Sequence, residues 1–168
     1  MRLNAAGQPE IRSFAIVKNP LLANVTDADL QEQFKLALQI REKLSKANES
    51  VVRIRELKTQ ISDRIGKLDK AKDAARISAG ETLIAKLTAV EGEIYQYRNQ
   101  SSQDPLNYPI KLNNKLAALA GMVGSADARP TDSSLQVFKE LSSRLDAQIA
   151  ALDTIVRVDL ASFDRTFK

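Results

Sequence analysis

Apolar residues recur at steps of three and four from Leu30 to Leu68, and neither Gly nor Pro interrupts this pattern before Gly66. This spacing is typical of one face of an α-helix, because side chains three and four residues apart lie on the same side. The pattern predicts one helix of about 40 residues, which at 1.5 Å per residue is roughly 60 Å long. Thr26 and Asp29, in "VTDADLQ", have the spacing of a capping box and predict where this helix begins.

Three later segments carry the same helical spacing. Apolar residues within 77–97, 112–123 and 135–163 predict a second helix, a short third helix and a fourth helix of about 30 residues. Gly80 stands where the second helix should carry an apolar residue, which predicts either close approach to a neighbouring helix or a weak point. Pro109 fits the first turn of the third helix, where its missing N–H costs nothing.

The connections between these helices are short and rich in turn formers, which makes successive helices antiparallel neighbours. Aromatic residues make up 5% of the chain and Trp is absent, so the core consists mainly of Leu, Ile, Val and Ala. Such a core suits helix packed on helix. We therefore expect an all-α fold: an elongated, antiparallel up-down-up-down four-helix bundle with one short helix, preceded by a short extended N-terminal segment.

The first 25 residues differ from the rest of the chain. In "EIRSFAIVKNPLL", residues 11–18 alternate as in a β-strand with apolar groups on both faces, and Asn19-Pro20 ends any regular element. Because one strand cannot make a sheet, this stretch is either an extended arm that packs on the bundle or the last strand of a preceding domain. We divide the chain into an N-terminal arm at residues 1–25 and a helical bundle domain at residues 26–168.

The chain contains neither His nor Cys. This excludes disulfides, zinc sites, catalytic triads with His and the Glu-x-x-His di-iron pattern of helical bundles. A carboxylate pair could still hydrolyse a glycoside, but Glu91 and Glu93 are two residues apart and therefore point in different directions on a helix. No phosphate-binding loop is present, since "AGMVGSAD" lacks the required Lys-Ser/Thr. We expect no catalytic residue, no metal ligand, no cofactor and no enzyme activity in this chain.

Basic residues gather near the first predicted reversal, and they are a candidate surface for an anionic partner. This cluster consists of Arg53, Arg55, Lys58, Arg64, Lys67 and Lys70. The chain carries a net charge of only +4, acidic residues such as Glu56 and Asp63 are interleaved with the cluster, and no aromatic residue is available for base stacking. We favour a solvated helix face and expect no nucleic-acid partner.

Tyrosine and asparagine side chains gather around the second predicted reversal, and they are a candidate patch for a carbohydrate or peptide. The patch consists of Tyr95, Tyr97, Asn107, Tyr108, Asn113 and Asn114. The alternative, which we favour, is structural: the tyrosines close the end of the bundle, and the asparagines bond to local backbone.

The segments "DLQEQFKLALQIREKLSKANESVVRIRELKTQI" and "DPLNYPIKLNNKLAALAGMVGSADARPTDSSLQVFKELSSRLDAQIAALD" resemble the C-terminal helical region of large bacterial proteins with sortilin-like, BNR-repeat β-propellers. These proteins are labelled glycosyl hydrolases or sialidase-like, and the resemblance covers residues 10–164. "RSFAIVKNP" resembles the end of the β segment that precedes that region, although the family more often has Asp-Pro-Arg at this join. The propeller's Asp-box, Ser-x-Asp-x-Gly-x-Thr-Trp, does not occur here, so the resemblance assigns no catalytic residue.

We therefore expect a non-catalytic accessory or interaction domain from the C-terminus of an exported propeller protein, supporting the propeller or docking another protein. The alternatives are a stand-alone helical adaptor or coiled-coil oligomer, and a carbohydrate-binding accessory domain. The sequence has no transmembrane run and no apolar signal-peptide core, so it is either cytoplasmic or part of a longer exported protein. The resemblance implies a periplasmic or extracellular setting. The sequence alone does not decide this setting, nor whether Met1 is the natural start of the protein.

Overall fold

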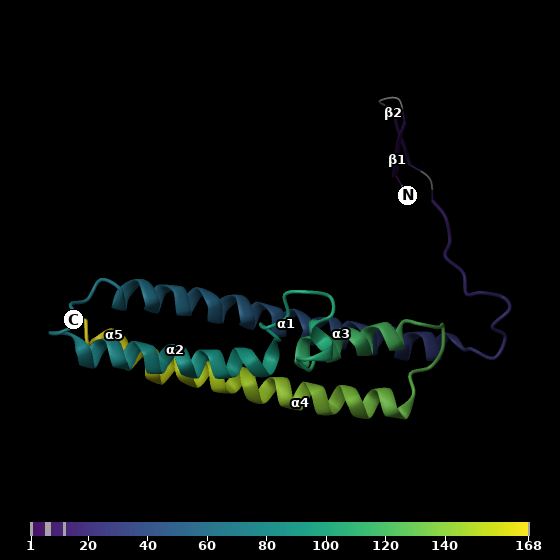
Figure 1. Cartoon of the computed structure of the whole chain (residues 1–168). Helices are drawn as coiled ribbons and strands as arrows, with labels where there is room; N and C mark the ends of the chain where they lie inside the picture. Colours follow the sequence, from purple (N-terminus) through teal and green to yellow (C-terminus); the bar gives the residue numbers. More distant parts are fainter. Residues whose placement is uncertain (1, 6–7, 12, 168) are drawn as a thin grey trace.

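The chain forms an elongated helical bundle, shown by a computed structural model that describes residues 2–5, 8–11 and 13–167 (Figure 1). Its helices are α1 (Asp27–Ile65), α2 (Ala74–Ile94), a 3₁₀ turn η1 (Asp104–Leu106), α3 (Leu112–Val123), α4 (Asp132–Thr154), a π-helical stretch η2 (Ile155–Leu160) and α5 (Ala161–Arg165). The expected all-α bundle, with one long and one short helix among its four main helices, is confirmed.

The capping box predicted at the start of α1 is present. The Oγ1 atom of Thr26 accepts a hydrogen bond from the backbone N–H of Asp29 at 3.2 Å, and the backbone N–H of Thr26 donates to the Asp29 carboxylate at 2.8 Å. The hydrogen bonds from Thr26 also lower the pKa of Asp29. Because the box satisfies N–H groups that the first helical turn leaves free, it fixes where the helix begins.

Contacts along α1 show that α2 and α3 both run antiparallel to it. Gln33, near the start of α1, donates to the carbonyl of the last residue of α3 at 2.6 Å. Asn48, midway along α1, lies beside Asn113 at the start of α3. Further along α1, Arg55 contacts Glu91 of α2. The two shorter helices therefore follow one another end to end along α1 (Figure 1).

The last helical stretch, α4 with η2 and α5, runs parallel to α1. Lys43 of α1 pairs with Asp146 of α4, and further along Arg64 pairs with Asp164 of α5. Within the helical bundle the chain thus reverses direction twice, between α1 and α2 and between α3 and α4, and three helical rows lie side by side. The up-down-up-down order expected from the sequence is wrong for α3, which keeps the direction of α2.

The segment between α2 and α3 interrupts a helical row instead of reversing it. The Asp104 carboxylate accepts hydrogen bonds from the backbone N–H groups of Gln100 and Ser101, which lower the pKa of Asp104. The Nε2 atom of Gln96 donates to the carbonyl of Pro109 at 2.9 Å and closes the segment. Pro109 precedes the N-cap residue of α3, so the expectation that it lies in the first turn is wrong.

Aliphatic side chains from all three rows form a continuous core. The largest of those that are fully buried are Leu36, Ile40, Ile54, Ile61, Leu87, Ile94, Leu112, Leu116, Leu145 and Leu152. Phe163 of α5 is also buried, beside Gly80 of α2. Most residues of the predicted helical stripes therefore meet in the core, whereas Phe34 of α1 and Leu135 of α4 are exposed.

The N-terminal arm carries two short strands, β1 (Arg2–Ala5) and β2 (Gln8–Ile11), which pair antiparallel with Arg2 opposite Ile11. Among the described residues these strands contact each other and no helix, and they lie away from the bundle in Figure 1. Residues 13–19 have no regular secondary structure. The strand predicted at residues 11–18 is therefore in the wrong position, because β2 ends at Ile11 and residues 13–18 belong to no strand.

Candidate functional site

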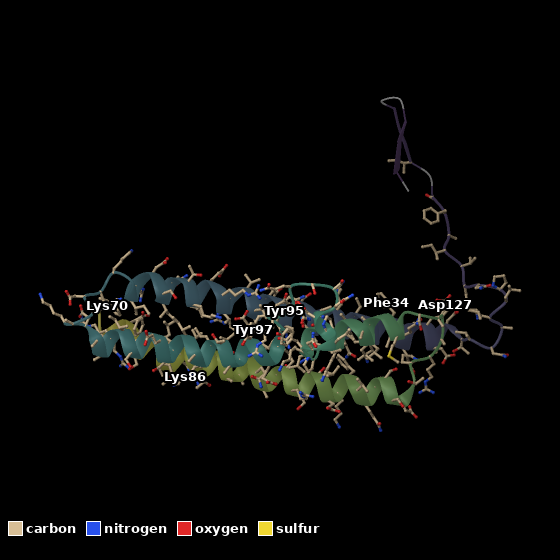
Figure 2. All side chains as sticks on the ribbon, viewed as in Figure 1. Phe34, Lys70, Lys86, Tyr95, Tyr97 and Asp127 are labelled. Carbon is tan, nitrogen blue, oxygen red and sulfur yellow. The ribbon has the colours of Figure 1, made fainter. Side chains whose placement is uncertain are left out.

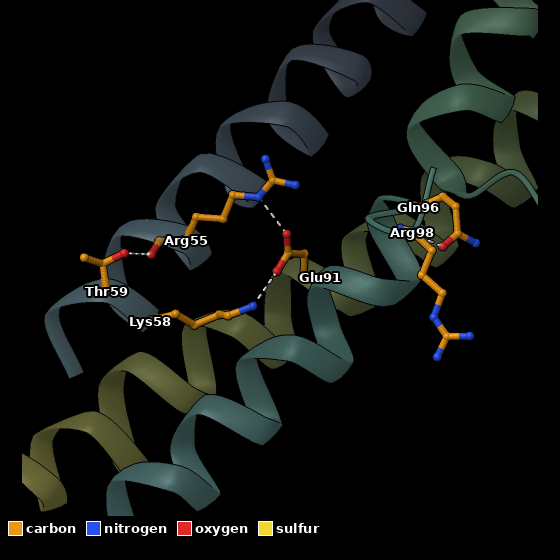
Figure 3. A network of polar contacts seen from close by, with 6 residues as sticks. All are labelled: Arg55, Lys58, Thr59, Glu91, Gln96 and Arg98. Carbon is orange, nitrogen blue, oxygen red and sulfur yellow. Dashed lines mark hydrogen bonds and ion pairs between the residues drawn. The ribbon is translucent and has the colours of Figure 1, made fainter. Parts of the chain in front are cut away.

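Glu91 is a buried acid that links α2 to α1. Its side chain is 3% exposed and accepts hydrogen bonds from Arg55 Nε at 2.7 Å and from Lys58 Nζ at 2.8 Å (Figure 3). Burial alone would raise the pKa of Glu91, but the hydrogen bonds from Lys58 and Arg55 outweigh burial and lower it. The guanidinium of Arg55 also lies 4.9 Å from the ring centre of Tyr95. We call these four side chains the Glu91 clasp.

The Glu91 clasp suits a structural role better than acid–base chemistry. A general acid needs a pKa raised toward the working pH, whereas the two cations favour ionised Glu91 and occupy both of its oxygens. The neighbouring Glu93 faces another direction, is 50% exposed and lies 3.4 Å from Lys111. The carboxylates of Glu91 and Glu93 therefore do not form a catalytic pair in one site.

Sequence reasoning considered Glu91 only as a catalytic candidate and missed its place in the core. A signal was available: Glu91 stands four residues after Leu87 and three before Ile94, which are both buried. An acid at this position of an apolar stripe predicts a buried partner.

The predicted basic cluster does not form one surface. Arg55 and Lys58 are held by Glu91, whereas the other two paired members reach across to the third row: Arg53 lies 3.4 Å from Asp153, and Arg64 contacts Asp164. The remaining members, Lys67 and Lys70, are exposed at the far end of the bundle, where Figure 2 labels Lys70, and have no ion pair within the described part of the chain. Four of the six cations therefore join helices.

Three members of the predicted tyrosine–asparagine patch do come together. Tyr97, Asn107 and Tyr108 line a groove of about 800 Å³ between α2 and the interruption that follows it. The guanidinium of Arg98 lies 5.9 Å from the ring centre of Tyr97 and 5.8 Å from that of Tyr108. The groove therefore offers two aromatic rings and a cation that already contacts both of them.

The other three members of the patch lie elsewhere. Tyr95 packs against the core beside Arg55, Asn113 is buried 3.5 Å from Asn48, and Asn114 is exposed. Figure 2 places Tyr95 and Tyr97 midway along the bundle. The expectation that the tyrosines close an end of the bundle is therefore wrong, because the segment that carries them interrupts a row.

An apolar groove between α3 and α4 was not predicted. It has a volume of about 280 Å³, and we call it the α3–α4 groove. Its lining residues are Ile110, Lys115, Ala118, Leu119, Met122, Thr131, Ser133, Ser134, Val137 and Leu141. Met122 is 70% exposed although it belongs to a helix with a buried stripe. The sequence did contain a signal for this groove, because Met122 is an apolar residue outside the buried stripe of α3.

The N-terminal arm carries a second exposed apolar surface. Its exposed members are Ile11, Phe14, Ile16, Val17 and Leu21. Ile16 reaches 89% exposure, and residues 13–17, which we call the arm segment, carry no charge. Exposed apolar side chains that follow one another in this way indicate contact with another surface.

Comparisons with known protein families, with curated proteins and with solved structures found no significant match. Among the described residues, no group of three or more acidic side chains is placed to hold a metal ion. Within the same part of the chain, no helix combines the length and the apolar character that a membrane span requires.

Proposed function

We propose that the chain is a non-catalytic helical interaction domain, and that it is an accessory domain of an exported propeller-type protein. The observation that carries the interaction role is the pair of exposed apolar surfaces, the arm segment and the α3–α4 groove. Apolar surface of this kind is typical of protein–protein contact sites.

The bundle itself suits the role of a rigid support. Its long rows are joined by ion pairs between helices, such as Lys43 with Asp146 and Lys86 with Asp159. The buried carboxylate of Glu91 is neutralised by two cations and so is not free for chemistry. These features support a domain that holds or spaces a partner.

The resemblance to helical regions that follow β-propellers supports the exported setting. In such a protein the bundle would lie beside the propeller, as a spacer or as a docking surface for another protein. The coding sequence upstream of Met1 tests this setting: Asp-boxes and a signal peptide in the same frame would support it, and an in-frame stop codon directly before Met1 would contradict it.

Photo-crosslinking in the native cell tests the interaction role. A photoreactive amino acid is placed at Ile16 or at Val137, and in the control at Lys139, which is exposed on the same helix as Val137. We expect position 16 or 137 to crosslink to one defined protein that mass spectrometry identifies, and position 139 to give no such adduct. The absence of adducts from both test positions would contradict the interaction role.

A carbohydrate-binding role is a second candidate, which the groove between Tyr97 and Tyr108 favours. Aromatic rings in an open groove suit the flat faces of sugars, and Arg98 could bond to hydroxyl or carboxylate groups. Arg98 already lies over both rings, however, which leaves less ring surface for a ligand. The interaction role therefore ranks first.

A further inference from the structure

We propose that the partner is a second copy of the chain, and that the arm segment of each copy docks into the α3–α4 groove of the other. This inference rests on the proposed interaction role and names its partner. It joins two surfaces of one molecule, each of which lacks cover within the described structure.

The arm segment has the chemistry of a docking strand. Phe14, Ile16 and Val17 are all exposed, and residues 13–17 make no backbone hydrogen bond within the described part of the chain. The neighbouring strand β2 contains Pro9, which has no N–H to donate, so a further strand could not pair along β2 without losing a bond. The arm segment is therefore the part of the arm best suited to docking.

The α3–α4 groove has the chemistry of an acceptor. Ile110, Met122 and Val137 are exposed at its surface, and Lys115 is the charged member of its lining. Low charge at the centre is typical of protein interfaces. Met122 adds an unbranched side chain that adapts to a docked partner.

The dimensions of the two surfaces agree. Five extended residues span about 17 Å at 3.3 Å per residue, and the 12 residues of α3 span about 18 Å at 1.5 Å per residue. An extended segment of this length would therefore cover the groove along α3. Because each copy has one arm segment and one groove, reciprocal exchange closes as a two-fold symmetric dimer.

The course of the arm favours a second copy over the same chain, and hydrogen bonds hold the root of the arm beside the start of α1 (Figure 1). Leu22 donates to the carbonyl of Asn19, Val25 donates to that of Leu22, and the side chain of Lys18 donates to the carbonyl of Val25. These turns lead directly into the capped start of α1. In Figure 1 the arm leaves at the end where α4 begins and turns away from α4. The arm segment is thus presented to a neighbour.

Light scattering of the purified full chain gives the first test. We expect a dimer at high micromolar concentration that dissociates on dilution. Ile16→Asp and Val137→Asp should each raise the dimer dissociation constant at least tenfold, because a charge would enter the apolar contact. Val52→Asp is the matched control, since Val52 is exposed on α1 outside the groove, and it should leave the constant unchanged.

Disulfide trapping gives the second test, and the absence of Cys from the chain makes it specific. Ile16→Cys in one preparation is mixed with Val137→Cys in another of different mass, and the mixture is oxidised. We expect the mixed disulfide in greater yield than with Val52→Cys as the partner. The yield depends on the two Cα atoms approaching to within about 7 Å.

Three results would overturn the inference. The first is a monomer at every concentration, and the second is a dimer that Ile16→Asp does not weaken. The third is a disulfide that forms only when both cysteines are in one chain, which would show that the arm docks on its own groove. None of these results contradicts the proposed interaction role, which fails only if the crosslinks in the native cell are absent.

Discussion

A Cβ atom on Gly80 would lie 2.5 Å from Cγ2 of Ile65, closer than such atoms approach in proteins. The same Cβ would lie 3.3 Å from the ring of Phe163. Gly80 therefore allows α2 to lie close to the end of α1 and to α5. Of the two roles that the sequence left open for this glycine, the structure supports close approach.

Gly80→Ala should destabilise the bundle. Alanine is favoured over glycine in a helix by about 1 kcal/mol, but overpacking at Ile65 costs about 1–3 kcal/mol. We expect a net loss of about 1 kcal/mol in the free energy of unfolding, measured with urea. Gly121→Ala is the control, because nothing lies within 4 Å of its added Cβ, and it should stabilise by about 0.5 kcal/mol. Equal effects at both positions would contradict the close approach.

Glu91→Gln should destabilise the chain more than Glu93→Gln does. Removing one partner of a buried ion pair costs about 3–5 kcal/mol, but Arg55 is 52% exposed and can regain water, so we expect about 2 kcal/mol. Glu93 is half exposed, and its pair with Lys111 should contribute less than about 0.5 kcal/mol. Urea unfolding at pH 7 measures the free energy of unfolding of both variants. Similar losses in the two variants would show that the buried ion pairs of Glu91 add no more stability than the exposed pair of Glu93.

The pH dependence of the Glu91 clasp has a definite sign. The folded pKa of Glu91 lies below its unfolded value, so the stabilisation is complete above the unfolded pKa, which is about 4.3 for Glu. It is lost as the pH falls through the folded pKa. We therefore expect the stability difference between the natural chain and Glu91→Gln to shrink from pH 7 to pH 3 in urea unfolding. If this stability difference instead grew as the pH fell, the pKa of Glu91 would be raised in the folded chain and not lowered.

The helices themselves could be predicted because their signals are local. The stripe from Leu30 onward, the capping box at Thr26 and the apolar spacing within 135–163 each depend on residues within a few positions of one another. The direction of α3 could not be predicted in this way. An apolar stripe indicates which face of a helix is buried. The stripe of α3 would be the same whether α3 ran antiparallel to α2 or continued in the direction of α2.

The candidate site was harder to predict because it depends on which helices become neighbours. Arg55 and Glu91 are 36 residues apart, and only their packing turns a charged helix face into the Glu91 clasp. Tyr97 and Tyr108 come together through the interruption, whereas Tyr95 points to the core. Three of the six residues predicted for the tyrosine–asparagine patch therefore lie together. Residue type suggested all six, and only the tertiary structure shows which three form a groove.

Gln96→Ala should loosen the interruption between α2 and α3. The Gln96 side chain is buried and donates to the carbonyl of Pro109, which is exposed and can bond to water once the donor is lost. The expected loss is therefore about 1 kcal/mol. Hydrogen exchange should become faster in residues 95–111 and stay unchanged in the middle of α1. Gln100→Ala is the control, since only the backbone of Gln100 bonds to Asp104. Uniformly faster exchange would show that Gln96 supports the whole bundle.

Tyr108→Ala separates the structural role of the tyrosine groove from a carbohydrate-binding role. If Tyr108 mainly packs with Arg98, its loss should cost about 1 kcal/mol and lower the melting temperature by about 3 °C. Calorimetry with neutral and acidic oligosaccharides should show no heat of binding for the natural chain. Asn114→Ala, at an exposed position outside the groove, should change neither measurement. A measurable oligosaccharide affinity that Tyr108→Ala abolishes at an unchanged melting temperature would instead establish the groove as a sugar site.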